Sequence, residues 1–157
     1  MNKVTPIPKG FHSITPYLVV KGAAQAIEYY KKVFGATEVF RMDGPDGKIG
    51  HAELRIGDSR IMLADENPKM GQGHASAASI GGSPVSLYLY IPDVDRVAER
   101  AVAEGAKILQ PVENKFYGDR TGFIQDPFGH LWCLSTHVED VSPQEMEERA
   151  KKAMRAA

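Results

Sequence analysis

Residues 120–140 bring together the residue types from which reactive sites are built. The stretch contains Cys133, the only cysteine of the chain, the histidines His130 and His137, and several carboxylates. Imidazole, thiolate and carboxylate groups serve as metal ligands and proton carriers. Alternation along a strand separates them, however, because neighbouring side chains point to opposite faces of a sheet. We therefore expect His130 and Trp132 on the helix-covered face and Cys133 on the other.

A second polar pattern lies in the first half of the chain. His51 and Glu53 alternate with apolar residues, which predicts a strand with both side chains on the face away from the helix. A histidine and a carboxylate in this arrangement could hold a divalent metal, with help from His130 or His137. A polar network of Glu53 with Arg55 or Arg60 in a partly hydrated cleft is the alternative.

Tyrosines mark the first predicted strand of each half. Tyr17 shares a face with Thr15, and Tyr88 and Tyr90 share a face with Ser86. We expect all five side chains to face a cleft. A tyrosine combines a large flat surface with a polar tip, which suits a planar or amphipathic small molecule. Simple filling of the cleft by aromatic rings is the alternative.

An arginine in the segment FYGDR adds a candidate for charge recognition. Arg120 has the strand parity of Ile124, which we assign to the cleft. A guanidinium there could bind a carboxylate or phosphate of a ligand in bidentate geometry. A salt bridge with Asp119 or Asp126 that fixes a hairpin is the alternative. Tyr117, at the mouth of the expected cleft, is a further candidate.

The elements that would position these residues follow from periodicity and turn signals. A β-α-β-β-β order is predicted in the first half and recurs in the second. The glycine- and serine-rich segment between them predicts a linker or mobile loop. The expected strands are 13–20, 37–42, 49–57, 59–66, 85–92, 106–114, 119–126 and 130–136, and the expected helices are 23–35 and 93–105.

An internal repeat supports this division. Gly35-Ala36 recurs as Gly105-Ala106 at an offset of 70 residues, and GDSRIML aligns with FGHLWCL at an offset of 71. Two copies of one unit predict a single α+β domain with pseudo-twofold symmetry, in which each copy needs the other to bury its sheet. The expected single domain spans 11–137, with module 1 at 11–66, the linker at 67–83 and module 2 at 84–137, and a helical tail at 138–157 follows.

The tail carries its own start signal. Ser142 is followed by Pro143 at the first helical position and by Glu145 three residues on, a capping box. The helix that it begins is rich in charge and is expected to be mostly solvated. Packing of Met146 and Met154 against a partner subunit is the alternative.

Bulk composition excludes several classes of function. The 157 residues are 43% hydrophobic and 25% charged, with a formal charge of −1, so nothing predicts binding to nucleic acid. A lone cysteine fits a reducing compartment. We find neither a signal peptide nor an apolar run of the roughly 20 residues that span a membrane. The expectation is a soluble, cytoplasmic protein without a nucleic-acid or membrane partner.

The pair of modules, with AIEYYKKVFGA in the first helix and DPFGHLW near the end, resembles the vicinal-oxygen-chelate superfamily. That group includes glyoxalase I, extradiol dioxygenases, fosfomycin-resistance enzymes and bleomycin-resistance proteins. Two longer segments, HAELRIGDSRIMLADE and YGDRTGFIQDPFGHLWCLSTHVED, look most similar to its PhnB-like and bleomycin-resistance branch. The resemblance covers residues 11–140 and implies an α+β fold in which curled mixed sheets surround a shared cleft. It implies the fold more strongly than the reaction.

In metal-using members, four ligands on the first and last strand of each module are usually His, Glu or Gln. The positions that match them in this chain hold Thr15, Met62, Ser86 and Cys133. Hydroxyls and a thioether are weak ligands for a hard divalent cation. The resemblance therefore implies the fold without the usual metal centre, and we predict no cofactor.

Two functions remain open after this comparison. The first is a metal-independent protein that binds a small amphipathic or aromatic molecule. The second is a glyoxalase-type lyase or isomerase with a divalent metal on His51, Glu53 and His130. No catalytic residue is assigned, and the resemblance implies a homodimer, often with swapped modules. The residues expected to contact a ligand are Thr15, Tyr17, Glu53, Ser86, Tyr88, Tyr90, Tyr117 and Arg120.

Overall fold

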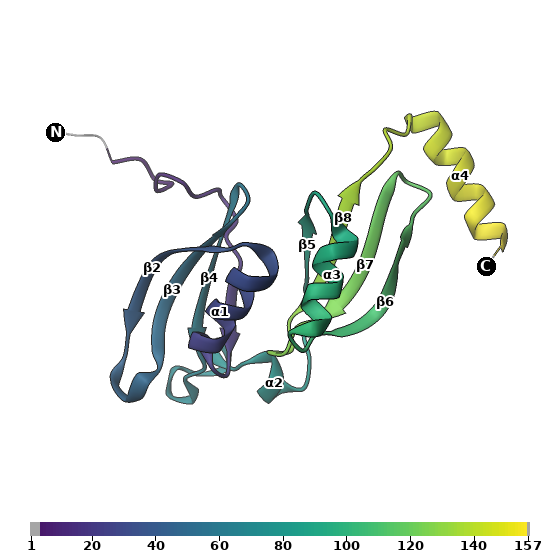
Figure 1. Ribbon diagram of the computed structural model, residues 1–157. Helices are drawn as coiled ribbons and strands as arrows, with labels where there is room; N and C mark the ends of the chain where they lie inside the picture. Colours follow the sequence, from purple (N-terminus) through teal and green to yellow (C-terminus); the bar gives the residue numbers. More distant parts are fainter. Residues whose placement is uncertain (1–3, 157) are drawn as a thin grey trace. The chain divides into compact units, whose positions relative to one another are not determined.

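The chain folds as two compact units, one ending at Ser83 and the other beginning at Pro84. A computed structural model describes residues 4–156 (Figure 1). Each unit contains a four-stranded mixed sheet and a helix packed on one of its faces. The predicted α+β fold of two β-α-β-β-β modules is confirmed.

The first unit orders its strands β1-β4-β3-β2. β1 runs parallel to β4, and the other neighbours are antiparallel. The parallel pair requires a crossover, which the first helix begins. The elements are β1 (Tyr17–Val20), α1 (Ala23–Phe34), β2 (Thr37–Asp43), the short turn η1 (Pro45–Gly47), β3 (Ile49–Ile56) and β4 (Ser59–Asp65).

The apolar stripe of α1 forms the core of this unit. Ile27, Tyr30 and Val33 follow each other at spacings of three and are at most 1% exposed, as the periodicity predicts. They cover the sheet face that carries Leu54, which is fully buried. Gly35 ends the helix in the left-handed conformation with φ 67°, which favours glycine.

The second unit repeats the order as β5-β8-β7-β6. Again the first and last strands are parallel and the other pairs antiparallel. Ile124, Trp132 and Leu134 are at most 2% exposed on the sheet face that α3 covers. The elements are β5 (Ser86–Tyr90), α3 (Val94–Ala103), β6 (Lys107–Asn114), β7 (Asp119–Gln125) and β8 (Leu131–His137).

The DPFGHLW segment forms the turn between β7 and β8, and its own side chains stabilise it. Asp126 accepts hydrogen bonds from the backbone N–H groups of Phe128 and His130 and from Trp132 Nε1, all at 2.9 Å. Gly129 occupies a positive φ of 90° in the turn. The motif thus uses its carboxylate and its indole to position the last strand.

The segment expected to be a linker contains regular structure. It forms the short turns η2 (Pro68–Met70) and η3 (Gln72–His74) and one turn of helix, α2 (Ala77–Ile80). Glu66 Oε2 accepts hydrogen bonds from Ser76 Oγ and Ser79 Oγ, both at 2.7 Å. The segment is therefore tied to the end of β4 by side chains.

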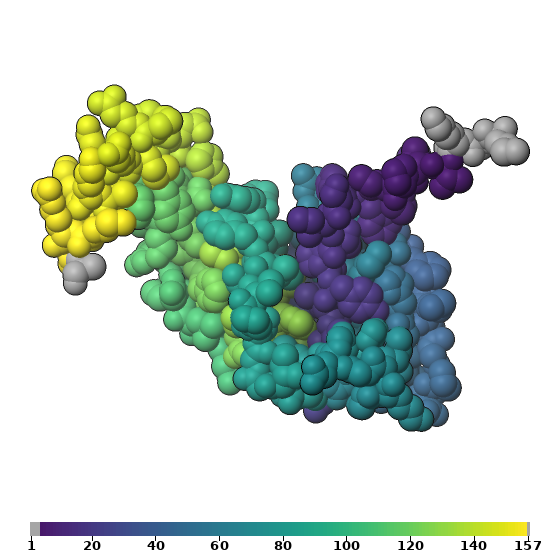
Figure 2. Space-filling view, turned by 180° about the vertical axis from the view of Figure 1, so that it is seen from behind, coloured from purple at the N-terminus to yellow at the C-terminus, as the bar shows by residue number. Residues whose placement is uncertain are grey.

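The tail helix α4 (Pro143–Ala156) begins as the capping box predicts, because Ser142 Oγ accepts from the Glu145 N–H at 3.2 Å. None of the residues of α4 is buried. Arg149 joins the helix to the rest of the unit through both oxygens of Glu139, at 2.8 and 2.6 Å. Figure 2 shows α4 as a lobe at one edge of the second unit. Within residues 4–156, no helix has the length and apolar character to cross a bilayer.

Candidate functional site

The second sheet presents tyrosines on its open face, the face opposite α3. Tyr88 pairs with Cys133 across β5 and β8, so both side chains lie on that face with Tyr90. The rings of Tyr88 and Tyr90 lie 5.1 Å apart at an interplanar angle of 43°. They remain 47% and 62% exposed. We call Tyr88, Tyr90 and the neighbouring Tyr117 the tyrosine shelf.

Asp119 lies behind the shelf and holds its hydroxyl groups. The residue is 4% exposed, and its Oδ2 accepts hydrogen bonds from Tyr88 Oη at 3.2 Å and Tyr90 Oη at 3.0 Å. Its other oxygen lies 2.7 Å from His137 Nδ1. Register explains the last contact, since Asp119 and His137 are direct partners across β7 and β8.

These contacts shift the ionisation of the cluster. Burial alone would raise the pKa of Asp119, but hydrogen bonds from His137, Tyr90 and Tyr88 lower it, and the net shift is downward. The Asp119 carboxylate raises the pKa of Tyr90 to about 12, because the phenol keeps the proton that it donates. The Tyr90 phenol therefore keeps its proton at physiological pH.

His137 connects the buried carboxylate to the surface. Its Nε2 lies 2.9 Å from Asp140 Oδ1, so both ring nitrogens face carboxylates. Hydrogen bonds with Asp140 and then Asp119 raise the pKa of His137 above its ordinary value. The arrangement favours the imidazolium, in which both nitrogens donate.

Small hydroxyl side chains complete the open face beneath the tyrosines. Thr121 Oγ1 and Ser135 Oγ lie 3.0 Å apart, and Tyr88 Oη, which donates its proton to Asp119, lies 3.3 Å from Ser135 Oγ. Burial raises the pKa of Tyr117 and also that of the Cys133 thiol. Cys133 is thus a buried thiol, and thiolate formation is disfavoured.

Arg120 does not face the shelf, and its predicted place in the cleft is wrong. Its Nε and Nη2 each lie 2.7 Å from an oxygen of Asp95 on α3. The hydrogen bonds from Arg120 lower the pKa of Asp95. The cause of the error is register: Ile124 pairs with Trp132, so the parity shared by Arg120 and Ile124 belongs to the helix face.

The open face of the first sheet carries a polar network. Glu53 lies 3.6 Å from His51 Nε2 and 3.5 Å from Arg60 Nη1. Tyr17 Oη lies 3.5 Å from His51 Nδ1. His51 and Glu53 therefore face away from α1 as alternation predicts, and Arg60 supplies the cation of the predicted network. Among residues 4–156, no three His, Cys, Asp or Glu side chains gather as a metal site would require.

Thr15 and His130 lie just outside the strands that were expected to contain them. Thr15 precedes β1, which begins at Tyr17, so it is not part of the strand. His130 belongs to the second unit, where its backbone N–H bonds to Asp126 in the turn before β8. Ser86 opens β5 as an exposed residue.

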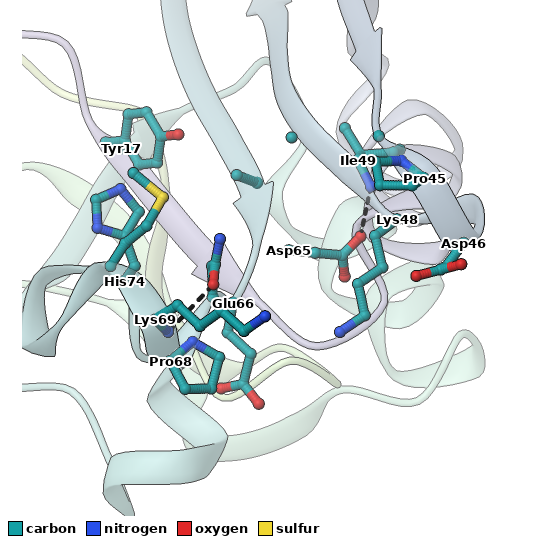
Figure 3. A pocket seen from close by; sticks show the side chains of 15 residues that line it. Tyr17, Pro45, Asp46, Lys48, Ile49, Asp65, Glu66, Pro68, Lys69 and His74 are labelled. Carbon is teal, nitrogen blue, oxygen red and sulfur yellow. Dashed lines mark hydrogen bonds between the residues drawn. The ribbon is translucent and has the colours of Figure 1, made fainter.

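A pocket of about 540 Å³ lies within the first unit (Figure 3). Tyr17 and Ile49 line it from the sheet, and Lys69, Met70 and His74 line it from the segment after β4. The rings of Tyr17 and His74 meet edge to face at 6.4 Å. Burial raises the pKa of Tyr17.

Several residues of these surfaces escaped prediction from sequence. From the sequence, Asp119 is expected only as a partner for Arg120. A usable signal is that Asp119 begins one strand of a hairpin and His137 ends the other, which places the two residues opposite each other. His74 and Lys69 lie in a segment without apolar periodicity, so no pattern places them at a pocket. Their positions depend on the fold of that segment.

Comparisons with known proteins agree with this architecture. The model of the Glyoxalase/Bleomycin resistance protein/Dioxygenase superfamily matches residues 10–134. An uncharacterized protein of Mycobacterium tuberculosis is 43% identical over 136 residues, which cover 86% of this chain and 80% of the relative. Protein YjdN of Escherichia coli is 25% identical over 148 residues, covering 78% and 93%.

Solved structures show the same fold. TioX from Micromonospora sp. ML1 matches with a TM-score of 0.61 at 25% identity, covering 83% of this chain and all of TioX. The PhnB protein from Bacillus cereus matches with a TM-score of 0.63 at 20% identity, covering 80% and 99%, which is a likeness of fold alone. The chain therefore belongs to the Glyoxalase/Bleomycin resistance protein/Dioxygenase superfamily.

Proposed function

We propose that this protein binds a small amphipathic or aromatic molecule on the tyrosine shelf and does so without a metal centre. The observation that carries the proposal is the pair of exposed rings, Tyr88 and Tyr90, whose hydroxyls are held by the buried Asp119. Fixed rings lose little conformational freedom when a ligand covers them. Aromatic stacking adds about 0.5 to 1.5 kcal/mol per pair beyond the area buried.

The side chains at the superfamily's ligand positions do not fit a divalent metal. Met62 offers a thioether on β4, and Thr15 offers a neutral hydroxyl before β1. In the second unit, Ser86 offers a hydroxyl, and burial raises the pKa of the Cys133 thiol. A metal ligand must be deprotonated if it is a cysteine, and hard cations prefer carboxylate oxygens. This donor chemistry supports binding without a metal.

A metal-dependent lyase or isomerase is the second candidate function. It is favoured by one contact, the 3.6 Å between His51 Nε2 and Glu53 Oε1 on the same sheet face. The proposed third ligand, His130, is part of the other unit. Elemental analysis of the purified chain would show about one divalent metal per chain under this alternative, and a melting scan with EDTA would show a loss of stability.

Binding to the shelf can be tested by thermal shift with a panel of aromatic antibiotics and carboxylated metabolites. A ligand at about 100 times its Kd stabilises the folded chain by about 2.7 kcal/mol. Replacing Tyr90 by alanine should abolish most of this shift because it removes an exposed ring. Tyr90→Phe keeps the ring and loses only the hydroxyl, so it should retain most of the shift.

Two further variants make the result specific. Arg120→Ala should leave the shift unchanged, because Arg120 is bound to Asp95 on the helix face. Phe40→Ala removes a comparably exposed aromatic ring from the first unit and should also be neutral. An equal shift in wild type and Tyr90→Ala would show that the ligand binds elsewhere.

A further inference from the structure

We propose that the pocket of the first unit is a second binding site, which takes a small aromatic organic anion such as a carboxylate or a phosphate ester. The pocket is built from residues between Tyr17 and His74, none of which belongs to the tyrosine shelf. The inference therefore does not depend on the function proposed for the shelf. It is based on the hydrogen-bonding state of the polar side chains that line the pocket.

Size and lining suit a small molecule. A volume of about 540 Å³ falls within the range of roughly 300 to 1,000 Å³ that is usual for ligand sites. Tyr17, Ile49 and Met70 give the pocket an apolar part, and Pro45 and Pro68 extend it. A ring placed there would be covered by apolar side chains while a polar substituent reaches the rim.

Two carboxylates of the pocket wall, Asp65 and Glu66, already accept hydrogen bonds from the protein. Asp65 accepts from the N–H groups of Gly22 and Ala23 at 2.9 and 3.0 Å, and from that of Ile49 at 2.8 Å. Glu66 accepts hydrogen bonds from the hydroxyls of Ser76 and Ser79 and also forms an ion pair with Lys21. Hydrogen bonds from Ser79 and Ser76 lower the pKa of Glu66 to about 2. Neither carboxylate needs a donor from a ligand.

Two lysines of the same pocket have ammonium groups that bond to no acceptor in the described part of the chain. Lys48 and Lys69 reach into the open part of the pocket from opposite walls (Figure 3). Within residues 4–156, neither ammonium group has a hydrogen bond or an ion pair. Asp46 is the carboxylate at the rim that lacks a described partner. Both lysines are exposed, so their six ammonium N–H groups are free of protein acceptors among the described residues and can donate to the oxygens of an anion.

His74 is a further polar residue of the pocket lining. Its Nδ1 is buried and has no hydrogen-bond partner among the described residues. Buried polar nitrogens are nearly always paired, because an unpaired one loses its hydration without compensation. Nδ1 itself has almost no exposed surface, so a ligand in the pocket would reach it only after the His74 ring turns toward the pocket.

The wall that carries His74 is formed before any ligand enters. The Asn67 N–H donates to the His74 carbonyl at 3.0 Å, and the His74 N–H donates to the Gly71 carbonyl at 3.1 Å. Glu66 fixes the following turn through Ser76. A preformed wall keeps the entropic cost of binding low.

The test uses the full chain and two dyes that differ in charge. Anilinonaphthalene sulfonate is an aromatic anion, and phenylnaphthylamine is its neutral counterpart. In ¹⁵N-labelled protein, the anion should shift the amide signals of Gly44 and Gly50, which line the pocket. Fluorescence titration should show tighter binding of the anion than of the neutral dye, and the difference should shrink with added salt.

Variants separate anion recognition from general apolar binding. Lys48→Gln with Lys69→Gln should weaken binding of the anion roughly tenfold and leave the neutral dye unaffected, because charge-assisted hydrogen bonds are lost. A control with the same change in net charge, Lys107→Gln with Lys152→Gln, alters exposed lysines of the second unit and should change neither affinity. Tyr90→Ala should also leave the anion bound, whatever its effect on the shelf.

Three results would overturn the inference. One is equal affinity for both dyes with no effect of the Lys48 and Lys69 substitutions. Another is a set of amide shifts confined to the second unit, which would place the anion elsewhere. The third is the absence of binding to the wild-type chain.

Discussion

Asp119 is the residue on which the open face of the second sheet depends. A buried carboxylate is costly unless it is hydrogen-bonded, and Asp119 obtains its partners from two tyrosines and His137. The same bonds fix the orientation of the tyrosine rings. Asp119 therefore sets the shape of the tyrosine shelf, which is proposed to bind a ligand, without contacting that ligand itself.

His137 gives this cluster a dependence on pH. Its folded pKa is raised above 6.5, so the stability it contributes is fully present below that value and is lost as the pH rises through the folded pKa. The melting temperature of wild type should exceed that of His137→Gln most at about pH 5.5, and the difference should decline by about pH 9. NMR titration of the ring protons would measure the pKa directly.

An exposed histidine provides the matched control. His12→Gln, in the segment before β1, removes an imidazole with no carboxylate partner described in residues 4–156 and should not reproduce the trend. A difference between wild type and His137→Gln that stays constant across this pH range would contradict the assignment.

The two helices that cover the sheets begin in different ways. Asp93 caps α3 locally, accepting one hydrogen bond from the Arg96 N–H at 3.1 Å. Gly22 stands at the start of α1 and has no side chain to cap it. Asp65, at the end of β4, supplies the missing acceptor and also binds the N–H of Ile49 at the start of β3. One carboxylate thus joins three elements of the first unit.

Replacement of Asp65 should therefore cost more than replacement of an ordinary cap. We expect Asp93→Ala to lower the free energy of unfolding by about 1 kcal/mol, the usual value for an N-cap. Asp65→Ala should lower it by about 2 to 3 kcal/mol, because three backbone donors lose their acceptor. Urea denaturation of both variants measures the difference. Equal losses would mean that water replaces the bonds of Asp65.

The resemblance to this superfamily implies that two copies of the chain form a homodimer. Apolar side chains remain exposed in both units, including Phe40 and Met42 on β2 and Ile108 and Leu109 on β6. Burial of such surface between subunits is favourable. The tail helix α4 has no buried residue and is held mainly by Arg149, so it contributes little to the core.

We predict a homodimer in solution. Analytical ultracentrifugation should give twice the chain mass of 17.2 kDa across a range of concentrations. A chain that ends at Val141 should remain dimeric if α4 is a solvated appendage. Dissociation of the shortened chain would instead favour packing of Met146 and Met154 against the partner, and a mass of 17.2 kDa for the full chain would contradict the dimer.

The sequence by itself determined the eight strands and the three longer helices, their order and the repeat of the module, because the spacing of apolar residues and the chemistry of turns are local properties. It also placed the tyrosines of β5 on the open face, since alternation needs only the strand. Tertiary structure decided the side of Arg120, because a single step in register moves a side chain to the opposite face. It also decided that Asp119 meets His137 and that Asp65 caps α1, since these contacts join residues that only the folded sheets bring together.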